Sequence, residues 1–147
     1  MKFISVAIIL LGLLYSTTEA QAFFLVSIND FVTTATNPES TFKEIETGIK
    51  TANPGKITKY LTENSYLSLP NGVAGYFSSS QSFYILKDFF KSFVPLSFNF
   101  RKRVNAQQPV ATGPLVYESK GKRENATVYV ELSYEGNTWR IVQFMVN

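Results

Sequence analysis

The side chains that most often carry catalysis are scarce in this chain of 147 residues. It has no cysteine and no histidine, which excludes thiol nucleophiles, the usual proton shuttle at neutral pH and the commonest zinc sites. Its two aspartates are Asp30, which precedes the first predicted helix, and Asp88, which lies near Lys87 and Lys91 on the expected solvent side of a long helix. We therefore expect no catalytic residue, no metal and no cofactor.

Aromatic side chains are the other candidates for function. Thirteen Phe and eight Tyr are many for this length, and they must line a core, a pocket or an interface. Those expected on the inner face of a sheet and on the long helix can line a pocket for a small apolar ligand, with one Gln as its polar group. These pocket candidates are Phe89, Phe93, Phe98, Phe100, Tyr134, Trp139, Gln143 and Met145. Ordinary filling of a closed core is the alternative.

Three helices are expected to position these groups. Two Asn-Pro steps, at residues 37–38 and 53–54, each place an N-cap residue before a proline at the first helical position. The second of these helices is expected to run to about residue 63. Ser78 and Gln81 have the spacing of a capping box and open the longest helix, which ends before Pro95.

The rest of the domain reads as strands. A short strand over residues 65–69 closes at a Pro-Asn-Gly turn. Four longer strands are expected at residues 98–104, 110–118, 127–134 and 138–146. Gly113-Pro114 is expected to force a bulge or bend in the second of them.

The last two strands form a hairpin whose register can be derived from a two-residue turn at Gly136-Asn137. Strict alternation then fixes which residues share a face. The inner face pairs Tyr134 with Trp139, Leu132 with Ile141, Val130 with Gln143 and Val128 with Met145. The second face pairs Ser133 with Arg140, Glu131 with Val142 and Tyr129 with Phe144.

The second face carries an apolar stripe made by Tyr129, Val142, Phe144 and Val146. An exposed stripe of this kind indicates a partner. We expect a homodimer interface there, and coverage by residues 23–36 is the alternative.

The N-terminal residues have the pattern of an export signal. Lys2 is followed by an apolar run to Leu14, and a small-x-small site ends at Ala22. Cleavage is expected after Ala22 or Ala20, with an uncleaved anchor as the alternative, although the run is shorter than the ~20 residues of a membrane span. We therefore expect a signal peptide over 1–22, a lead-in segment over 23–36 and one domain over 37–147.

Export predicts a periplasmic or secreted protein that meets the membrane only through its transient signal peptide. The net charge of +3 is mildly basic and does not indicate nucleic acid. Two basic clusters, at residues 101–103 and 120–123, are expected to be solvated surface. A patch for anions or acidic lipids is the alternative, in which the clusters converge near one sheet edge.

The order of elements, with the stretches Ser80-Gln81, 85–90 (ILKDFF), 111–115 (ATGPL) and 139–141 (WRI), resembles the nuclear transport factor 2-like fold, which includes SnoaL-like and ketosteroid isomerase-like proteins. More narrowly, residues from about 38 to 147 resemble an exported bacterial family, domain of unknown function 4783. The resemblance implies an α+β domain in which three N-terminal helices pack in the concave face of a strongly curved antiparallel sheet, often as a dimer. It implies no activity.

Three functional readings follow. The favoured one is an exported, non-catalytic binding or interaction domain with a hydrophobic recess between the long helix and the sheet. The second is a small enzyme of isomerase or dehydratase type that uses an Asp or Glu in that recess on an apolar ligand. The third is a purely structural envelope protein without a ligand.

Overall fold

The computed structural model describes residues 37–104 and 107–147, apart from the side chains of Lys102 and Val104. The predicted signal peptide and lead-in segment lie outside the described residues. Asn37–Asn147 forms one compact unit, and the description below concerns that unit alone. Within it, no helix has the length and apolar content that a membrane crossing requires.

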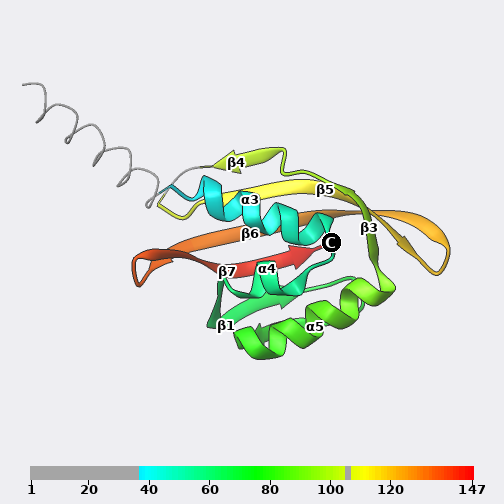
Figure 1. The fold of residues 1–147 in the computed structure, drawn as a ribbon, viewed down its shortest axis with the longest axis horizontal. Helices are drawn as coiled ribbons and strands as arrows, with labels where there is room; N and C mark the ends of the chain where they lie inside the picture. The colour runs from blue at the N-terminus through cyan, green and yellow to red at the C-terminus, as the bar shows by residue number, and fades with distance from the viewer. Residues whose placement is uncertain (1–36, 105–106) are drawn as a thin grey trace, which may run out of the picture. The chain divides into compact units, whose positions relative to one another are not determined.

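Three helices lie on one side of a sheet: α3 (Glu39–Lys50), α4 (Pro54–Thr58) and α5 (Ser79–Ser92) (Figure 1). The start signals of α4 and α5 work as predicted. The side chain of Asn53 caps α4 by accepting from the backbone of Lys56, and the capping box of α5 is complete, with reciprocal bonds between Ser78 and Gln81 of 3.0 and 3.2 Å. The first helix begins one residue later than expected, because Asn37 instead accepts from the amide of Glu39.

The second helix is shorter than predicted. It ends at Thr58, and the chain is already extended from Leu61. Gly48 of α3 makes this turn possible, since a Cβ there would lie 2.8 Å from Ile57 of α4. The close helix pair therefore directs the chain straight into the sheet.

Seven strands form one sheet in the order β2-β1-β7-β6-β5-β3, with β4 also paired to β5. Their bounds are β1 Leu61–Ser68, β2 Ala74–Phe77, β3 Val94–Phe98, β4 Lys102–Val104, β5 Val110–Ser119, β6 Lys122–Glu135 and β7 Thr138–Val146. The expectation of a purely antiparallel sheet is wrong at one place, because β1 pairs with β7 in parallel. Strand β2 was not predicted, and it forms a hairpin with β1 around the Pro-Asn-Gly turn.

The predicted strand over 98–104 is in fact two strands. Strand β3 pairs with the second half of β5, from Glu118 to Leu115. Strand β4 pairs with its first residues, from Thr112 to Val110. The connection between them crosses directly over Gly113, where a Cβ would overlap the carbonyl oxygen of Asn99 and lie 2.9 Å from the Cα of Phe100. Strand β5 itself stays in continuous register with β6, so the bulge considered at Gly113-Pro114 is absent from this pairing.

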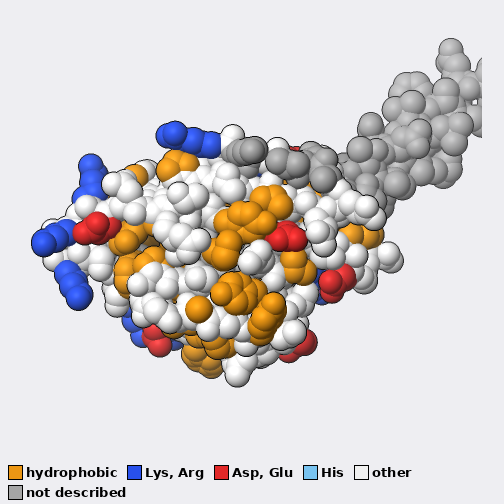
Figure 2. Space-filling model, turned by 180° about the vertical axis from the view of Figure 1, so that it is seen from behind, with side chains coloured by type: hydrophobic (Ala, Val, Ile, Leu, Met, Phe, Trp, Pro, Cys, Tyr) orange, Lys and Arg blue, Asp and Glu red, His pale blue; other side chains and the backbone are white. Residues whose placement is uncertain are grey.

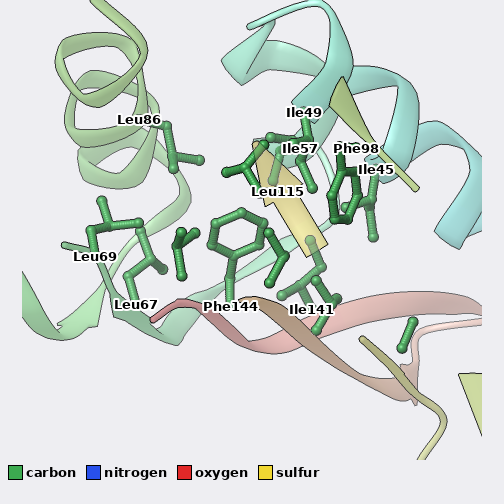
Figure 3. Close-up of a cluster of buried hydrophobic side chains, with 14 of the residues drawn as sticks. Ile45, Ile49, Ile57, Leu67, Leu69, Leu86, Phe98, Leu115, Ile141 and Phe144 are labelled. Carbon is green, nitrogen blue, oxygen red and sulfur yellow. The ribbon is translucent and has the colours of Figure 1, made fainter. Parts of the chain in front are cut away.

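The core lies between the helices and the inner face of the sheet (Figure 3). Ile45, Ile49 and Ile57 enter it from α3 and α4, Leu86 enters from α5, and Phe144 of β7 lies near its centre. Each of these side chains is buried. Sheet and helices therefore close on one another through a continuous apolar layer.

A half-buried carboxylate ties α3 to the β3–β4 connection. Glu46 accepts from the backbone amide of Phe100 at 3.0 Å and pairs with Lys50 at 2.8 Å and Arg103 at 3.2 Å. Burial by itself raises the pKa of Glu46, but the hydrogen bonds from Lys50 and Phe100, together with the charges of Lys50 and Arg103, outweigh it and lower the pKa below its ordinary 4.5.

Glu46→Gln is therefore expected to cost about 1–3 kcal/mol at pH 7. Because the folded pKa lies below the unfolded one, the Glu46 contribution is present above the unfolded value of 4.5 and is lost as pH falls through the folded value. Denaturant unfolding at pH 7 and pH 3 measures the free energy of unfolding of the wild type and of Glu46→Gln. Glu44→Gln is the control, since Glu44 pairs with two lysines at the surface and should change stability by less than about 0.5 kcal/mol. Equal effects of the two changes would contradict this role.

Candidate functional site

A β-bulge in β7 decides which side chains face away from the helices. The hairpin begins in the predicted register, with Tyr134 opposite Trp139 and Leu132 opposite Ile141. The register then shifts by one residue, so that Glu131 lies opposite Gln143. Val142 is the extra residue, and every residue after it in β7 changes face relative to strict alternation.

The shift moves two predicted pocket residues out of the inner face. Gln143 and Met145 lie opposite Glu131 and Tyr129 rather than Val130 and Val128. The amide nitrogen of Gln143 lies 3.5 Å from the sulfur of Met145, as expected for neighbours on one face. Their predicted orientation toward the recess is wrong.

The same shift moves two predicted interface residues into the core. Phe144 is 1% exposed and Val146 is 2% exposed, and they lie opposite Val130 and Val128. Tyr129 stays on the outer side of the sheet, half-buried, and Val142 is half-buried at the bulge itself. Half of the predicted interface set thus remains available to a partner.

The other pocket candidates fall in three places. Phe89, Phe98 and Phe100 are at most 9% exposed within the core, and the Phe98 and Phe100 rings lie 4.9 Å apart. Phe93 is half-buried at the end of α5. Tyr134 and Trp139 pair at 5.0 Å near the β6–β7 turn, with Tyr134 42% exposed. The structure therefore does not gather the predicted set around one recess, because the aromatic rings between α5 and the sheet pack on each other.

An outer face results from the register of five strands. We define it by the outward side chains Tyr66, Tyr76, Val110, Thr112, Tyr129, Glu131, Val142, Gln143 and Met145. One cross-strand row runs from Tyr76 through Tyr66 and Gln143 to Glu131. Figure 2 shows groups of hydrophobic side chains between polar ones on this side of the molecule.

Two tyrosines on this face were missed by the sequence analysis. The rings of Tyr66 and Tyr76 meet edge to face with centroids 5.3 Å apart, and Tyr76 is 66% exposed. Two extended segments flanking a Pro-Asn-Gly turn are a hairpin signal, and that signal would have placed both rings on one face.

The polar centre of the outer face is a tyrosine–carboxylate pair. The Tyr129 hydroxyl donates to Glu131 at 3.0 Å. Burial, followed by this hydrogen bond and the negative charge of Glu131, raises the pKa of Tyr129 above its ordinary 10.0. Tyr129 therefore stays neutral at physiological pH, so the pair is a hydrogen-bonding feature rather than a base with an activated phenol.

Four of the other described carboxylates form ion pairs, namely those of Glu39, Glu44, Glu46 and Asp88. Asp88 lies on the solvent side of α5, as predicted, and pairs with Lys91 at 2.8 Å. That hydrogen bond and the Lys91 charge lower the pKa of Asp88. In residues 37–104 and 107–147, no cluster of three or more acidic side chains is arranged to hold a metal ion.

The two basic clusters do not converge. Lys102 lies opposite Thr112 at one end of β5, and Lys122 lies opposite Ser119 at the other. Seven residues of strand separate them, or about 23 Å at 3.3 Å per residue. The alternative, one shared patch at a sheet edge, is therefore excluded.

Comparison with solved structures defines the fold as nuclear transport factor 2-like. A DUF4783 family protein from Bacteroides uniformis is 18% identical, with a TM-score of 0.64 over 71% of this chain and 94% of that one. A ketosteroid isomerase-like protein from Erwinia carotovora atroseptica is 12% identical, with a TM-score of 0.59 over 74% and 90%. The structure called Rd1NTF2_04 with long sheet is 12% identical, with a TM-score of 0.60 over 76% and 100%. At these identities the likeness shows the fold alone.

Residues 42–147 match the family described as domain of unknown function DUF4783. The chain belongs to this family. No curated protein matches it in sequence.

Proposed function

We propose that this protein is an exported, non-catalytic interaction domain that self-associates through the outer face of its sheet. The observation that carries the proposal is the outward row of Tyr76, Tyr66 and Gln143, continued by Tyr129 and Met145 on the neighbouring positions. Tyrosine and methionine are enriched in interfaces because they supply large contact area with few rotatable bonds or with adaptable shape.

A second copy of the chain fits the charges of this face. A two-fold symmetric interface brings the same patch against itself, so a patch of one charge sign would repel its copy. The outer side of the sheet carries Glu131 on β6 and Arg140 on β7, which lies opposite Ser133, two residues along β6 from Glu131. Arg140 is half-buried and donates to the carbonyl of Lys59 at 2.9 Å. One acid and one base allow each copy to place opposite charges against the other.

The placement of carboxylates supports a non-catalytic role. A general base must reach its substrate in a site that excludes water. Every Asp and Glu in residues 37–104 and 107–147 is at least partly exposed, and the aromatic rings at the centre of the inner face are closed on each other. The isomerase-type alternative needs an opening of this core that brings a carboxylate inside, and the ketosteroid isomerase-like neighbour contributes fold likeness only.

Sedimentation velocity of the purified protein tests the interface. Tyr76→Lys, on the outer face, is expected to raise the dimer dissociation constant about tenfold or more, since aromatic side chains buried on association contribute much of the interface energy. Tyr84→Lys on α5 is the matched control, because Tyr84 is 65% exposed and Tyr76 is 66% exposed. A wild-type protein that stays monomeric at all concentrations, or equal effects of the two changes, would contradict the proposal.

Export is tested separately from self-association. Expression of the full chain in a bacterium with two membranes should release a protein in the periplasm whose intact mass begins at Phe23 or Gln21. A cytoplasmic protein that keeps residues 1–22 would refute export and leave the dimer proposal standing.

A further inference from the structure

A basic hollow lies at the end of α5, away from the outer face. Two adjoining depressions of about 570 and 410 Å³ share Pro70, Phe93, Ser119 and Lys120 in their walls. Lys91 and Ser92 also border the first, and Lys122 and Glu124 the second. Three segments far apart in sequence, namely the β1–β2 turn, the C-terminal end of α5 and the β5–β6 turn, thus enclose one space.

The β5–β6 turn places two exposed lysines beside the hollow. Ser119 pairs with Lys122, which leaves Lys120 and Gly121 as a two-residue turn with φ of 51° and 72°. Glycine, asparagine and aspartate accept such a φ readily, whereas lysine does so at a cost in backbone energy. Lys120 therefore occupies a turn position that glycine would fill at lower backbone cost.

The charges of the hollow favour an anion. Lys91, Lys120 and Lys122 against Glu124 leave a net charge of two positive among the lining side chains. Lys91 pairs with Asp88, but in the described part of the chain neither Lys120 nor Lys122 has a carboxylate partner. The C-terminal end of α5 adds roughly half a negative charge, so the positive charge offered to a ligand comes from Lys120 and Lys122. Figure 2 shows Lys and Arg side chains gathered at the end of the molecule where Figure 1 places the β5–β6 hairpin.

One wall of the hollow is aromatic. The Phe93 ring stacks on Phe89 at 4.6 Å and lies 5.4 Å from the ring of Tyr117. Phe93 is half-buried and Tyr117 is 7% exposed. The hydroxyls of Ser92 and Ser119 add hydrogen-bond donors beside the lysines.

We propose that this hollow binds a phosphate monoester that carries an apolar or flat organic group. The dianionic phosphate matches the two ammonium charges of Lys120 and Lys122 and can accept from several donors at once, and the organic group packs on Phe93 and Tyr117. The phosphate can belong to a soluble molecule or to the head group of a lipid. This site lies apart from the outer face, so it does not depend on self-association.

Titration calorimetry of the purified protein with phenyl phosphate tests the proposal. Lys120→Gly removes the ammonium and relaxes the turn, so it should preserve or raise thermal stability while weakening binding about tenfold. Lys87→Ala on the exposed side of α5 is the control and should leave binding unchanged. Binding should also weaken as salt is raised.

Three outcomes would overturn the proposal. The first is the absence of any heat of binding with phenyl phosphate at about 5 mM, a concentration high enough to detect a weak ligand. The second is an equal affinity for phenol, which lacks the phosphate. The third is an unchanged affinity for phenyl phosphate in Lys120→Gly. Co-sedimentation with phosphatidylcholine vesicles, with and without phosphatidic acid, whose head group is a phosphate monoester, identifies the source of the phosphate. Sedimentation that requires phosphatidic acid and that phenyl phosphate displaces supports a lipid head group, and binding of phenyl phosphate without sedimentation supports a soluble ligand.

Discussion

Replacing Gly113 by alanine is expected to destabilise the domain by at least about 3 kcal/mol. The added Cβ would overlap the carbonyl of Asn99 and lie 2.9 Å from the Cα of Phe100. Both obstacles are backbone atoms, so no side-chain rotation relieves them. The β3–β4 connection would have to move away from β5, and it would take with it the amide of Phe100 that Glu46 holds.

Two other glycines provide a graded control for this prediction. Gly48→Ala meets Ile57 at 2.8 Å and should cost about 1 kcal/mol, because the gain in helix propensity offsets part of the clash. Gly55→Ala meets its nearest atom at 3.3 Å and should change stability by less than about 0.5 kcal/mol. Denaturant midpoints measure all three. If Gly113→Ala unfolds at the same midpoint as Gly55→Ala, the chain does not cross over Gly113 as described.

Phe144→Ala is expected to cost about 3–5 kcal/mol, whereas Met145→Ala next to it should cost about 1 kcal/mol or less. Phe144 lies among Leu67, Leu115 and Ile141 at the centre of the core (Figure 3), and its removal leaves a cavity. Met145 is half-buried on the outer face, where water can fill the space.

Strict alternation along β7 predicts the reverse order for these two changes. Without the bulge, Met145 points inward and Phe144 outward. Unfolding free energies of the two variants therefore test the bulge at Val142 independently of any ligand or partner.

Local signals in the sequence were sufficient for the starts of α4 and α5 and for the last hairpin turn. The capping box of Ser78 and Gln81 and the turn at Gly136-Asn137 depend on neighbouring residues only, and both form as predicted. Gly48 marks a close approach of α3 to α4.

The bulge could not be predicted from alternation, because β7 contains adjacent apolar residues on both sides of Gln143. Either register therefore buries a similar apolar set in this strand. The difference lies in Gln143, whose amide would face Val130 in the regular register. Burying an amide without a partner costs about 1–3 kcal/mol, and the bulge avoids that cost by placing Phe144 there.

The parallel pairing of β1 with β7 depends on contacts between the two ends of the domain. Tyr66 meets Gln143, 77 positions along the chain, and Leu67 meets Phe144. No local pattern specifies such a pairing. The missed pairing also explains why the outer face was predicted without Tyr66 and Tyr76.

Thiol labelling of single-cysteine variants tests the central claim, that the bulge turns one set of β7 side chains outward and the next set inward. The chain has no cysteine of its own, so each variant carries one thiol. In dilute protein, the thiols of Gln143→Cys and Met145→Cys should react rapidly, and those of Phe144→Cys and Val146→Cys should be protected until the domain unfolds. Rapid labelling at 144 and 146 with protection at 143 and 145 would contradict the account of both the core and the outer face.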